Sequence, residues 1–201
     1  MVSLKKGQKV SLKKKSGSQL NKIFFGLNWG MITKKNFLFG ESKISVDFDI
    51  SIVLLDKQNN ILETIYFRNK TAPGIKHHGD DQSGDEKDDG LDNEVIELLL
   101  SDINPKTVNI GLLLNSYLHQ KLDSVPYAGC RVFEGSVDKP TNILAKVDIA
   151  NSVQFKGKES IIMGTLRKEG DSWEFVCVAE PTNATTITQL GRDYVNFVKD
   201  N

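Results

Sequence analysis

The chain has 201 residues, and its 26 lysines and arginines balance 26 aspartates and glutamates, so the formal net charge is zero. Dedicated nucleic-acid and anionic-membrane binders are normally basic overall, so this balance argues against both classes. Hydrophobic residues make up 39%, and the plentiful aliphatic residues argue against a disordered chain. A chain of this length can bury a sizeable core, and we interpret residues 1–201 as a single domain.

Neither a disulfide framework nor a membrane segment is expected. Two cysteines, Cys130 and Cys177, are too few for such a framework, and both sit among apolar residues that favour reduced, buried thiols. The segment 1–12 carries lysines but lacks the apolar core of a secretory signal. No apolar run approaches the ~20 residues of a transmembrane helix. We therefore expect a cytoplasmic protein.

The first part of the chain predicts short strands. Residues 2–4 and 10–12 repeat the pattern Val-Ser-Leu around Gly7, which predicts a hairpin or two strands with a tight turn. Residues 23–30 are aromatic and aliphatic, which is typical of a strand. Residues 31–43 are mixed in character and are interpreted as a loop, in which three apolar side chains would pack on the core: Phe37, Leu38 and Phe39.

The remainder predicts an all-β fold that ends in a helix. Apolar runs with turn signals between them indicate strands at 46–55, 61–68, 95–100, 108–114, 128–133, 142–149, 160–166 and 173–178. The run 95–100 could also be helical, but the all-β setting favours a strand. Apolar residues recur at helical spacing over 186–199, and Thr185 or Thr186 could cap this helix. The connections are mostly too short for helical crossovers, so we expect an antiparallel β-sandwich or barrel.

An acidic segment at 77–94 stands out from this pattern because it is crowded with carboxylates and contains one cation, Lys87. Two unit charges about 4 Å apart interact by roughly 1 kcal/mol in water and by more in a partly desolvated site. The segment is therefore either extended and solvated, as acidic tails are, or organised around a cation. Its glycines at turn spacing and its direct continuation into a predicted strand favour the second interpretation.

The predicted strand 46–55 carries two further carboxylates. Side chains alternate along a strand, so Asp47, Asp49 and Ser51 share one face. Aspartate is depleted in strands, which leaves two interpretations. The face is either a solvated outer surface or the place where these oxygens reach the acidic segment.

Oxygen donors of this kind indicate calcium. Ca²⁺ takes six to eight oxygen ligands in flexible geometry, whereas Mg²⁺ demands stricter octahedral geometry, and zinc would want cysteine and histidine together. No start position fits the EF-hand pattern. His77 and His78 are more often structural than ligating in such a setting. The candidate ligands for Ca²⁺ are Asp47, Asp49, Asp80, Asp81, Ser83, Asp92, Asn93 and Glu94.

Catalytic signals are weak. The sequence contains neither a Gly-x-Ser-x-Gly elbow nor a phosphate-cradling glycine loop. A metal among carboxylates could activate water, but no residue is marked as a nucleophile or a general acid. We therefore expect a protein that is not an enzyme, with a metal-assisted hydrolase as a less favoured hypothesis.

Several segments, taken in order, resemble the TerD family of tellurium-resistance and general stress proteins. They are the opening at 2–12, Gly-Leu-Asn-Trp at 26–29, Asp-Phe-Asp-Ile-Ser at 47–51 and Gly-Asp-Asp-Gln-Ser-Gly at 79–84. In this loop Asp81 stands where the family usually has Asn, and Ser83 where it has Thr. Asp92-Asn93-Glu94 stands for Asp-Asp-Glu, and the stretch between is longer.

The resemblance implies a β-sandwich of two antiparallel sheets that binds Ca²⁺ through the acidic loop, without established enzymatic activity. Family members accompany resistance to tellurite and other chemical damage, at or near the inner membrane face within a larger assembly. The leading hypothesis is thus a calcium-binding stress-response module, with other stress-resistance proteins as partners and no nucleic acid. The alternative is a Ca²⁺-dependent sandwich that docks on membranes or carbohydrates.

Overall fold

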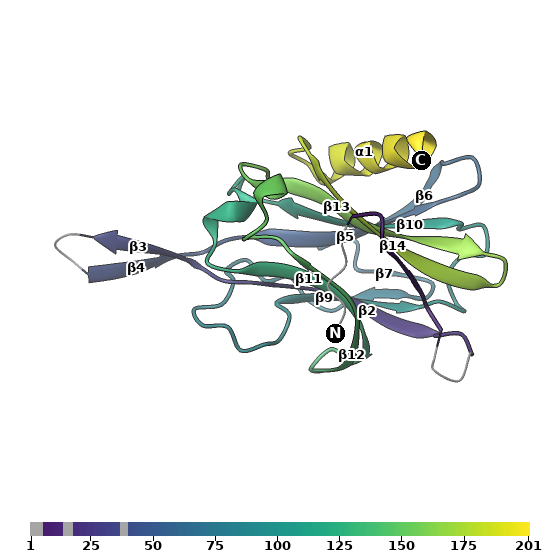
Figure 1. Cartoon of the computed structure of the whole chain (residues 1–201), viewed down its shortest axis with the longest axis horizontal. Helices are drawn as coiled ribbons and strands as arrows, with labels where there is room; N and C mark the ends of the chain where they lie inside the picture. The colour runs from purple at the N-terminus through teal and green to yellow at the C-terminus, as the bar shows by residue number, and fades with distance from the viewer. Residues whose placement is uncertain (1–5, 14–17, 37–39) are drawn as a thin grey trace.

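Two six-stranded sheets lie face to face in the computed structural model, which describes residues 6–13, 18–36 and 40–201 (Figure 1). The first sheet contains, in spatial order, β1 (Lys9–Ser11), β14 (Ser172–Thr182), β13 (Ser160–Glu169), β10 (Asn109–Ser116), β5 (Phe48–Leu55) and β6 (Ile61–Ile65). The second contains β12 (Lys139–Asp148), β11 (Ala128–Ser136), β2 (Lys22–Trp29), β9 (Glu94–Leu99), β8 (Ile75–His77) and β7 (Thr71–Ala72). Neighbouring strands are antiparallel in both sheets, so the predicted antiparallel sandwich is confirmed.

Strand β5 explains how the layers are built, because all eight of its residues are buried. Its even-numbered residues, Phe48, Ile50, Ile52 and Leu54, point into the core between the sheets. Its odd-numbered residues point to the outer face, where Val53 and Leu55 pack beneath a helix. A strand covered on both faces loses the polar alternation of a half-exposed strand.

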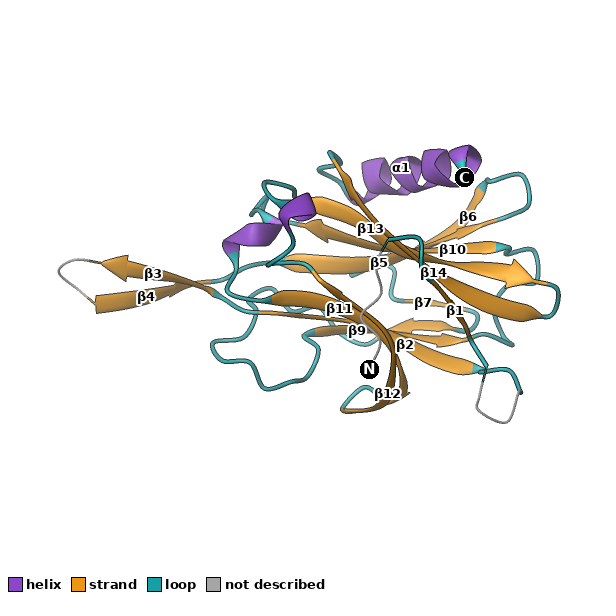
Figure 2. Cartoon of the chain, in the orientation of Figure 1, coloured by secondary structure: helices purple, strands orange, loops and turns teal. Residues whose placement is uncertain are grey.

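The covering helix is α1 (Ile187–Asp200), which lies across the outer face of the first sheet (Figure 2). Thr186 caps its start, because the Thr186 hydroxyl accepts a hydrogen bond from the Gln189 N–H. Leu190 and Tyr194 are its fully buried apolar residues. The Tyr194 ring fits over Gly111, where an added Cβ would lie 2.5 Å from the ring. The predicted helix and one of its two predicted caps are therefore confirmed.

The expected loop at 31–43 is wrong. Strands β3 (Ile32–Asn36) and β4 (Gly40–Ile44) form a hairpin that projects from the body of the sandwich (Figure 1). Strand β3 pairs with β4. None of the hairpin's residues whose exposure the structure describes is buried, and lysines 34, 35 and 43 are exposed, so no buried face gives this stretch an alternating apolar pattern. Residues 37–39, expected to pack on the core, lie outside the described residues.

Two other local expectations change. Residues 2–4 lie outside the described residues, and β1 pairs with β14, with Lys9 opposite Val176. The segment that follows the predicted strand 61–68 contains the short strand β7, which pairs with β8. Short 3₁₀ turns at Leu122–Ser124 and Val153–Phe155 bury Leu122 and Phe155.

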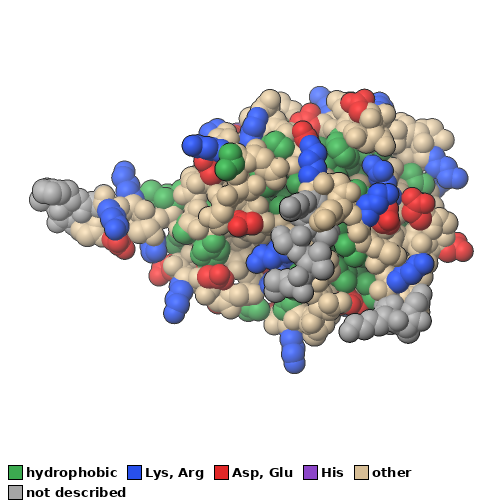
Figure 3. Space-filling view, viewed as in Figure 1, with side chains coloured by type: hydrophobic (Ala, Val, Ile, Leu, Met, Phe, Trp, Pro, Cys, Tyr) green, Lys and Arg blue, Asp and Glu red, His purple; other side chains and the backbone are tan. Residues whose placement is uncertain are grey.

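Positive and negative side chains are interspersed over the face shown in Figure 3, in keeping with the zero net charge. Within the described residues, the structure has no helix of the length and apolarity needed to cross a membrane.

Candidate metal centre

Three carboxylates converge at one end of β5. Asp47 immediately precedes the strand, Asp49 is its second residue, and Asp80 comes from the loop that follows β8. One carboxylate oxygen from each lies within 4.8 Å of the other two. An ion that binds oxygens at about 2.3 to 2.6 Å can contact three atoms with this spacing. The structure thus brings the strand carboxylates and the acidic loop together.

Burial of two of these groups makes their charge costly. Asp47 is 7% exposed and Asp49 is 2% exposed, so the alternative that this face is a solvated outer surface is wrong. Burial, together with the neighbouring charges of Asp80 and Asp81, raises the pKa of Asp47 to about 6. Burial, together with the charges of Glu94 and Asp47, raises the pKa of Asp49 to about 8. Arg68 lines the same cavity but is a single cation against three carboxylates, so the ionised cluster needs further positive charge.

Glu94 approaches the same place from the second sheet. Its side chain is fully buried, and its Oε2 accepts a hydrogen bond of 2.9 Å from the Ile50 N–H. This N–H is available because β6 pairs with β5 only from Ile52 onward. The Oε1 atom has no hydrogen-bond partner among the described residues. Burial raises the pKa of Glu94 well above its usual value, and the charge of Asp80 adds to this effect.

His77 packs against Glu94, a contact that sequence reasoning did not identify. Its Nε2 lies 3.6 Å from Glu94 Oε2, and both side chains are fully buried. Burial lowers the pKa of His77 to about 4, so the ring is neutral at pH 7. The Gly79 N–H donates to Nδ1, which assigns the ring proton to Nε2. His78, in contrast, pairs with Glu97 at 3.0 Å near the surface.

Three other predicted ligands hold the loop in shape. Asp81 Oδ1 accepts hydrogen bonds from the Ser83 N–H, the Ser83 hydroxyl and the Gly84 N–H at 2.8 to 3.0 Å. The Asn93 amide donates to Asp81 and Asp85, and its oxygen accepts from the Trp29 N–H. This network contradicts the alternative that the acidic segment is simply an extended, solvated run.

These bonds also decide the ionisation of Asp81. Burial raises its pKa, but the donors of Gly84, Ser83 and Asn93 outweigh burial and lower the pKa overall. Asp81 therefore remains ionised at neutral pH because the protein itself satisfies its charge. This distinguishes it from Asp47 and Asp49, whose pKa values are raised by burial and by neighbouring carboxylates.

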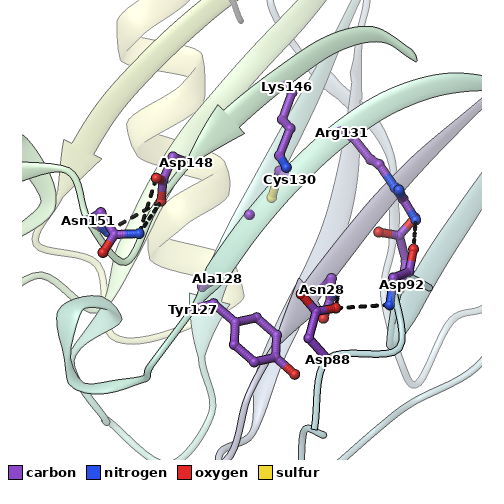
Figure 4. Close-up of a pocket in the computed structure, with 12 residues that line it drawn as sticks. Asn28, Asp88, Asp92, Tyr127, Ala128, Cys130, Arg131, Lys146, Asp148 and Asn151 are labelled. Atoms are coloured by element: carbon purple, nitrogen blue, oxygen red, sulfur yellow. Dashed lines mark hydrogen bonds and ion pairs between the residues drawn. The ribbon is translucent and has the colours of Figure 1, made fainter. Parts of the chain in front are cut away.

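Asp92 lies elsewhere, in a cavity on the outer face of the second sheet (Figure 4). Its Oδ2 accepts a hydrogen bond of 2.9 Å from Arg131 Nε. Asn28 and Asp88 are hydrogen-bonded to each other in the same cavity. Burial raises the pKa of Asp92 to about 6, although the Arg131 hydrogen bond and charge oppose the shift. The structure therefore does not bring Asp92 together with the three converging carboxylates.

Asn115 is a further polar residue at the centre. It lies directly opposite Asp49 in the register of β10 and β5. Its Nδ2 donates to Asp49 Oδ2 at 3.4 Å, while its buried Oδ1 has no partner among the described residues. Only the strand pairing places this residue beside Asp49, so the sequence alone offered no signal for it.

The residues present fit a calcium ion. Asp47, Asp49 and Asp80 supply hard, negatively charged oxygens at a suitable spacing. Asp47 Oδ1 and Glu94 Oε1 are buried and lack partners among the described residues, and such groups are normally satisfied by protein, water or an ion. Glu94 is not one of these three residues, but its charge raises the pKa of Asp49, and the charges of Asp80 and Asp47 raise the pKa of Glu94.

The chain matches one known protein family over nearly its whole length. The model of the TerD domain matches residues 1–194 of the chain. The chain belongs to the TerD family. The tellurium resistance protein TerZ of Serratia marcescens is 33% identical over 202 residues, which cover 98% of this chain and 99% of TerZ. The stress response protein SCP2 of Bacillus subtilis is 28% identical and covers 96% of this chain and 99% of its own.

Solved structures agree with the TerD fold. A homologue of telluride resistance protein TerD from Streptomyces coelicolor superposes with a TM-score of 0.66 at 14% identity. The alignment covers 86% of this chain and 95% of the homologue. The protein of unknown function SAV2460 also gives a TM-score of 0.66, at 17% identity, over 84% of this chain and 94% of its own. At these identities the likeness concerns the fold alone.

Proposed function

We propose that this TerD-family protein binds Ca²⁺ through Asp47, Asp49 and Asp80, with Glu94 beside them, and acts in a stress response associated with resistance to tellurite and other chemical damage. The observation that carries the proposal is the convergence of three carboxylates, two of them buried, within 4.8 Å. The relatives named as tellurium resistance and stress response proteins support the physiological part.

A bound calcium ion would supply positive charge where the fold has concentrated negative charge. Asp49 belongs to the first sheet, Glu94 to the second, and Asp80 to the loop between β8 and β9. These residues would therefore hold three separate parts of the chain together when their charges are matched. Asp81, Ser83 and Asn93 fix the loop that carries Asp80.

We further propose that the protein is a binding module and not an enzyme. Burial raises the pKa of Cys130 well above its ordinary value and that of Cys177 to about 11. Both side chains are thus thiols and not thiolate nucleophiles at neutral pH. We also propose that the protein is cytoplasmic and that its partners are other stress-resistance proteins at the inner membrane face. Affinity purification after tellurite exposure, compared with untreated cells, would identify such partners.

Calorimetric titration with Ca²⁺ tests the metal site. We expect binding by the wild-type protein and an affinity at least about tenfold lower in Asp49→Asn, because ligand charge sets Ca²⁺ affinity. Asp171→Asn is the matched control, since Asp171 is an exposed residue in the turn between β13 and β14. The absence of both heat and thermal stabilisation at millimolar Ca²⁺ would contradict the proposal.

Two exposed side chains favour a second candidate function, namely Ca²⁺-dependent docking on a membrane. Tyr117 is 47% exposed and Leu118 is 54% exposed, and both line a cavity together with the three carboxylates. Exposed apolar groups beside an ion site could enter a lipid surface. Sedimentation with phosphatidylserine vesicles, in Ca²⁺ and in chelator, tests this candidate. Equal sedimentation in the two conditions, or no sedimentation in Ca²⁺, would exclude it.

A further inference from the structure

Two cavities adjoin the metal centre and share part of their walls. One, of about 420 Å³, is lined by Asp47, Asp49 and Asp80. The other, of about 380 Å³, contains Asp49 and extends to Asn115 and to the start of α1. Four residues line both cavities: Asp49, Phe67, Arg68 and Tyr117. Volumes of this size accommodate small molecules.

Aromatic side chains form one wall of the 380 Å³ cavity. The Phe67 and Tyr117 rings meet edge to face with centroids 5.6 Å apart, and Tyr66 meets Phe67 in the same way at 5.3 Å. Tyr117 remains 47% exposed despite these contacts. An exposed, braced ring offers a surface on which a flat apolar group can stack at little entropic cost.

Positive charge faces the same cavity from two elements. The Arg68 guanidinium lies 5.3 Å from the centroid of the Phe67 ring, so the aromatic wall supports it. Thr186, the N-cap of α1, and Ile187, its first residue, line the same cavity. The amino-terminal end of a 14-residue helix carries partial positive charge and unpaired N–H groups, both of which favour an anion.

A buried, unpartnered polar atom also points to a ligand. Asn115 is 6% exposed and lines the cavity, and its Oδ1 has no partner among the described residues. The Nδ2 of the same side chain is directed to Asp49, which leaves the oxygen to accept a hydrogen bond. The protonated oxygen of a phosphate monoester can supply that donor.

We propose that this cavity binds a small phosphate monoester that carries a flat aromatic group. The phosphate lies between the metal centre, Arg68 and the start of α1, and the ring lies against Tyr117 and Phe67. The inference rests on the proposed Ca²⁺ site, because the three carboxylates would otherwise repel the phosphate. A bound Ca²⁺ ion would offset two of the three carboxylate charges, and Arg68 and the start of α1 would attract the phosphate.

Calorimetry with phenyl phosphate as the probe tests the inference, with protein that has first been titrated with Ca²⁺. We expect phenyl phosphate to bind the Ca²⁺-loaded wild type, with binding lost in chelator. Arg68→Gln should weaken binding about tenfold or more, and Tyr117→Leu about fivefold. Arg192→Gln is the matched control because Arg192 is exposed on α1 and lines neither cavity.

The outcomes separate this inference from the proposed function. Protein that binds no Ca²⁺ contradicts both. Protein that binds Ca²⁺ but not phenyl phosphate contradicts the inference alone. Equal affinities for phenyl phosphate and inorganic phosphate contradict the aromatic subsite, and unchanged affinity in Arg68→Gln contradicts the anion subsite. Binding of phosphatidylserine vesicles without binding of phenyl phosphate would replace the small-molecule site with membrane docking.

Discussion

Adjacent aspartates in the acidic loop have opposite environments. Asp80 directs an oxygen towards Asp47 and Asp49, whereas Asp81 accepts hydrogen bonds from Ser83, Gly84 and Asn93. A carboxylate that receives several donors contributes to folding, while one that faces other carboxylates opposes it. The two positions therefore form a matched pair for separating ion binding from loop structure.

The pair predicts opposite effects of substitution. Asp81→Ala should lower the free energy of unfolding of the metal-free protein by about 1 to 3 kcal/mol, because it leaves donors without an acceptor. Asp80→Ala should weaken Ca²⁺ binding with a smaller loss of metal-free stability, because it removes one exposed hydrogen bond from Gln82 and relieves repulsion. Urea unfolding in chelator measures the first effect and calorimetry the second. Equal losses of metal-free stability in the two variants would contradict the assignment.

Titration at the centre predicts how metal-free stability depends on pH. The pKa of Asp49 is raised to about 8 and that of Asp47 to about 6. A raised carboxyl pKa gives stability that is complete below the unfolded value and is lost as pH rises through the folded value. The metal-free protein should thus become more stable as pH falls from about 8.5 to about 6.5.

Below that window His77 opposes the trend. Its pKa is lowered to about 4, so the unfolded state takes up a proton first, and this one group removes stability as pH falls from about 6.5 towards 4. Asp49, and Asp47 below about pH 6, act in the opposite direction over the same range, so His77 should reduce the gain in stability below pH 6.5 without reversing it. Thermal melts in chelator across these pH values measure the gain, with Asp49→Asn as the variant that should flatten it between pH 8.5 and 6.5. Stability that rises steadily from pH 6.5 to 8.5 would contradict the assigned pKa shifts.

At the scale of elements, α1 determines where the centre remains accessible. The helix covers Val53 and Leu55 on the outer face of β5, and it begins at the end of the strand where Asp49 lies. Asp49 is therefore buried by neighbouring strands and loops while a cavity still reaches it. The position at which the helix starts is consequently part of the site.

The cap of this helix gives a prediction. Thr186→Ala removes the acceptor of the Gln189 N–H and should lower the free energy of unfolding by about 0.5 to 2 kcal/mol. Thr188 is exposed in the first turn of α1, so Thr188→Ala should change the free energy of unfolding by no more than about 0.5 kcal/mol. Chemical denaturation followed by circular dichroism compares them, and equal effects would contradict the assigned cap.

For the whole molecule, the proposed ion would connect the two sheets. The Ile50 N–H of the first sheet donates to Glu94 of the second, and Asp80 approaches from the loop between β8 and β9. A ligand that binds only the folded state at a hundredfold excess over its dissociation constant stabilises that state by about 2.7 kcal/mol. This stabilisation should appear mainly in the segments that contact the ion site, namely the start of β5 and the loop that carries Asp80.

Hydrogen exchange tests this distribution. Ca²⁺ should slow exchange of the Ile50 amide and of amides in the loop 79–85, where the centre lies. The amides of β3 and β4 should change little, because that hairpin projects from the sandwich (Figure 1). Uniform protection of hairpin and loop, or protection in neither, would contradict a local ion site.

The sequence by itself indicated an antiparallel all-β fold, the terminal helix and the approach of the strand aspartates to the acidic loop. Strand alternation placed Asp47 and Asp49 on one side of the strand. These inferences succeed because strand period and helix period are local properties of the chain. The cation that the crowded charge of the acidic loop predicts stays a prediction.

Only the tertiary structure decided which of the predicted ligand residues lie at the metal centre and which lie elsewhere. Strand register placed Asn115 beside Asp49, sheet packing brought Glu94 to Ile50, and Arg131 drew Asp92 into a separate cavity. The β3–β4 hairpin was not predicted because none of its residues whose exposure is described is buried, and its sequence therefore lacks the apolar alternation of a half-buried strand. Residues distant in sequence share hydrogen bonds and desolvation only after folding, so composition could identify the donors but not their partners.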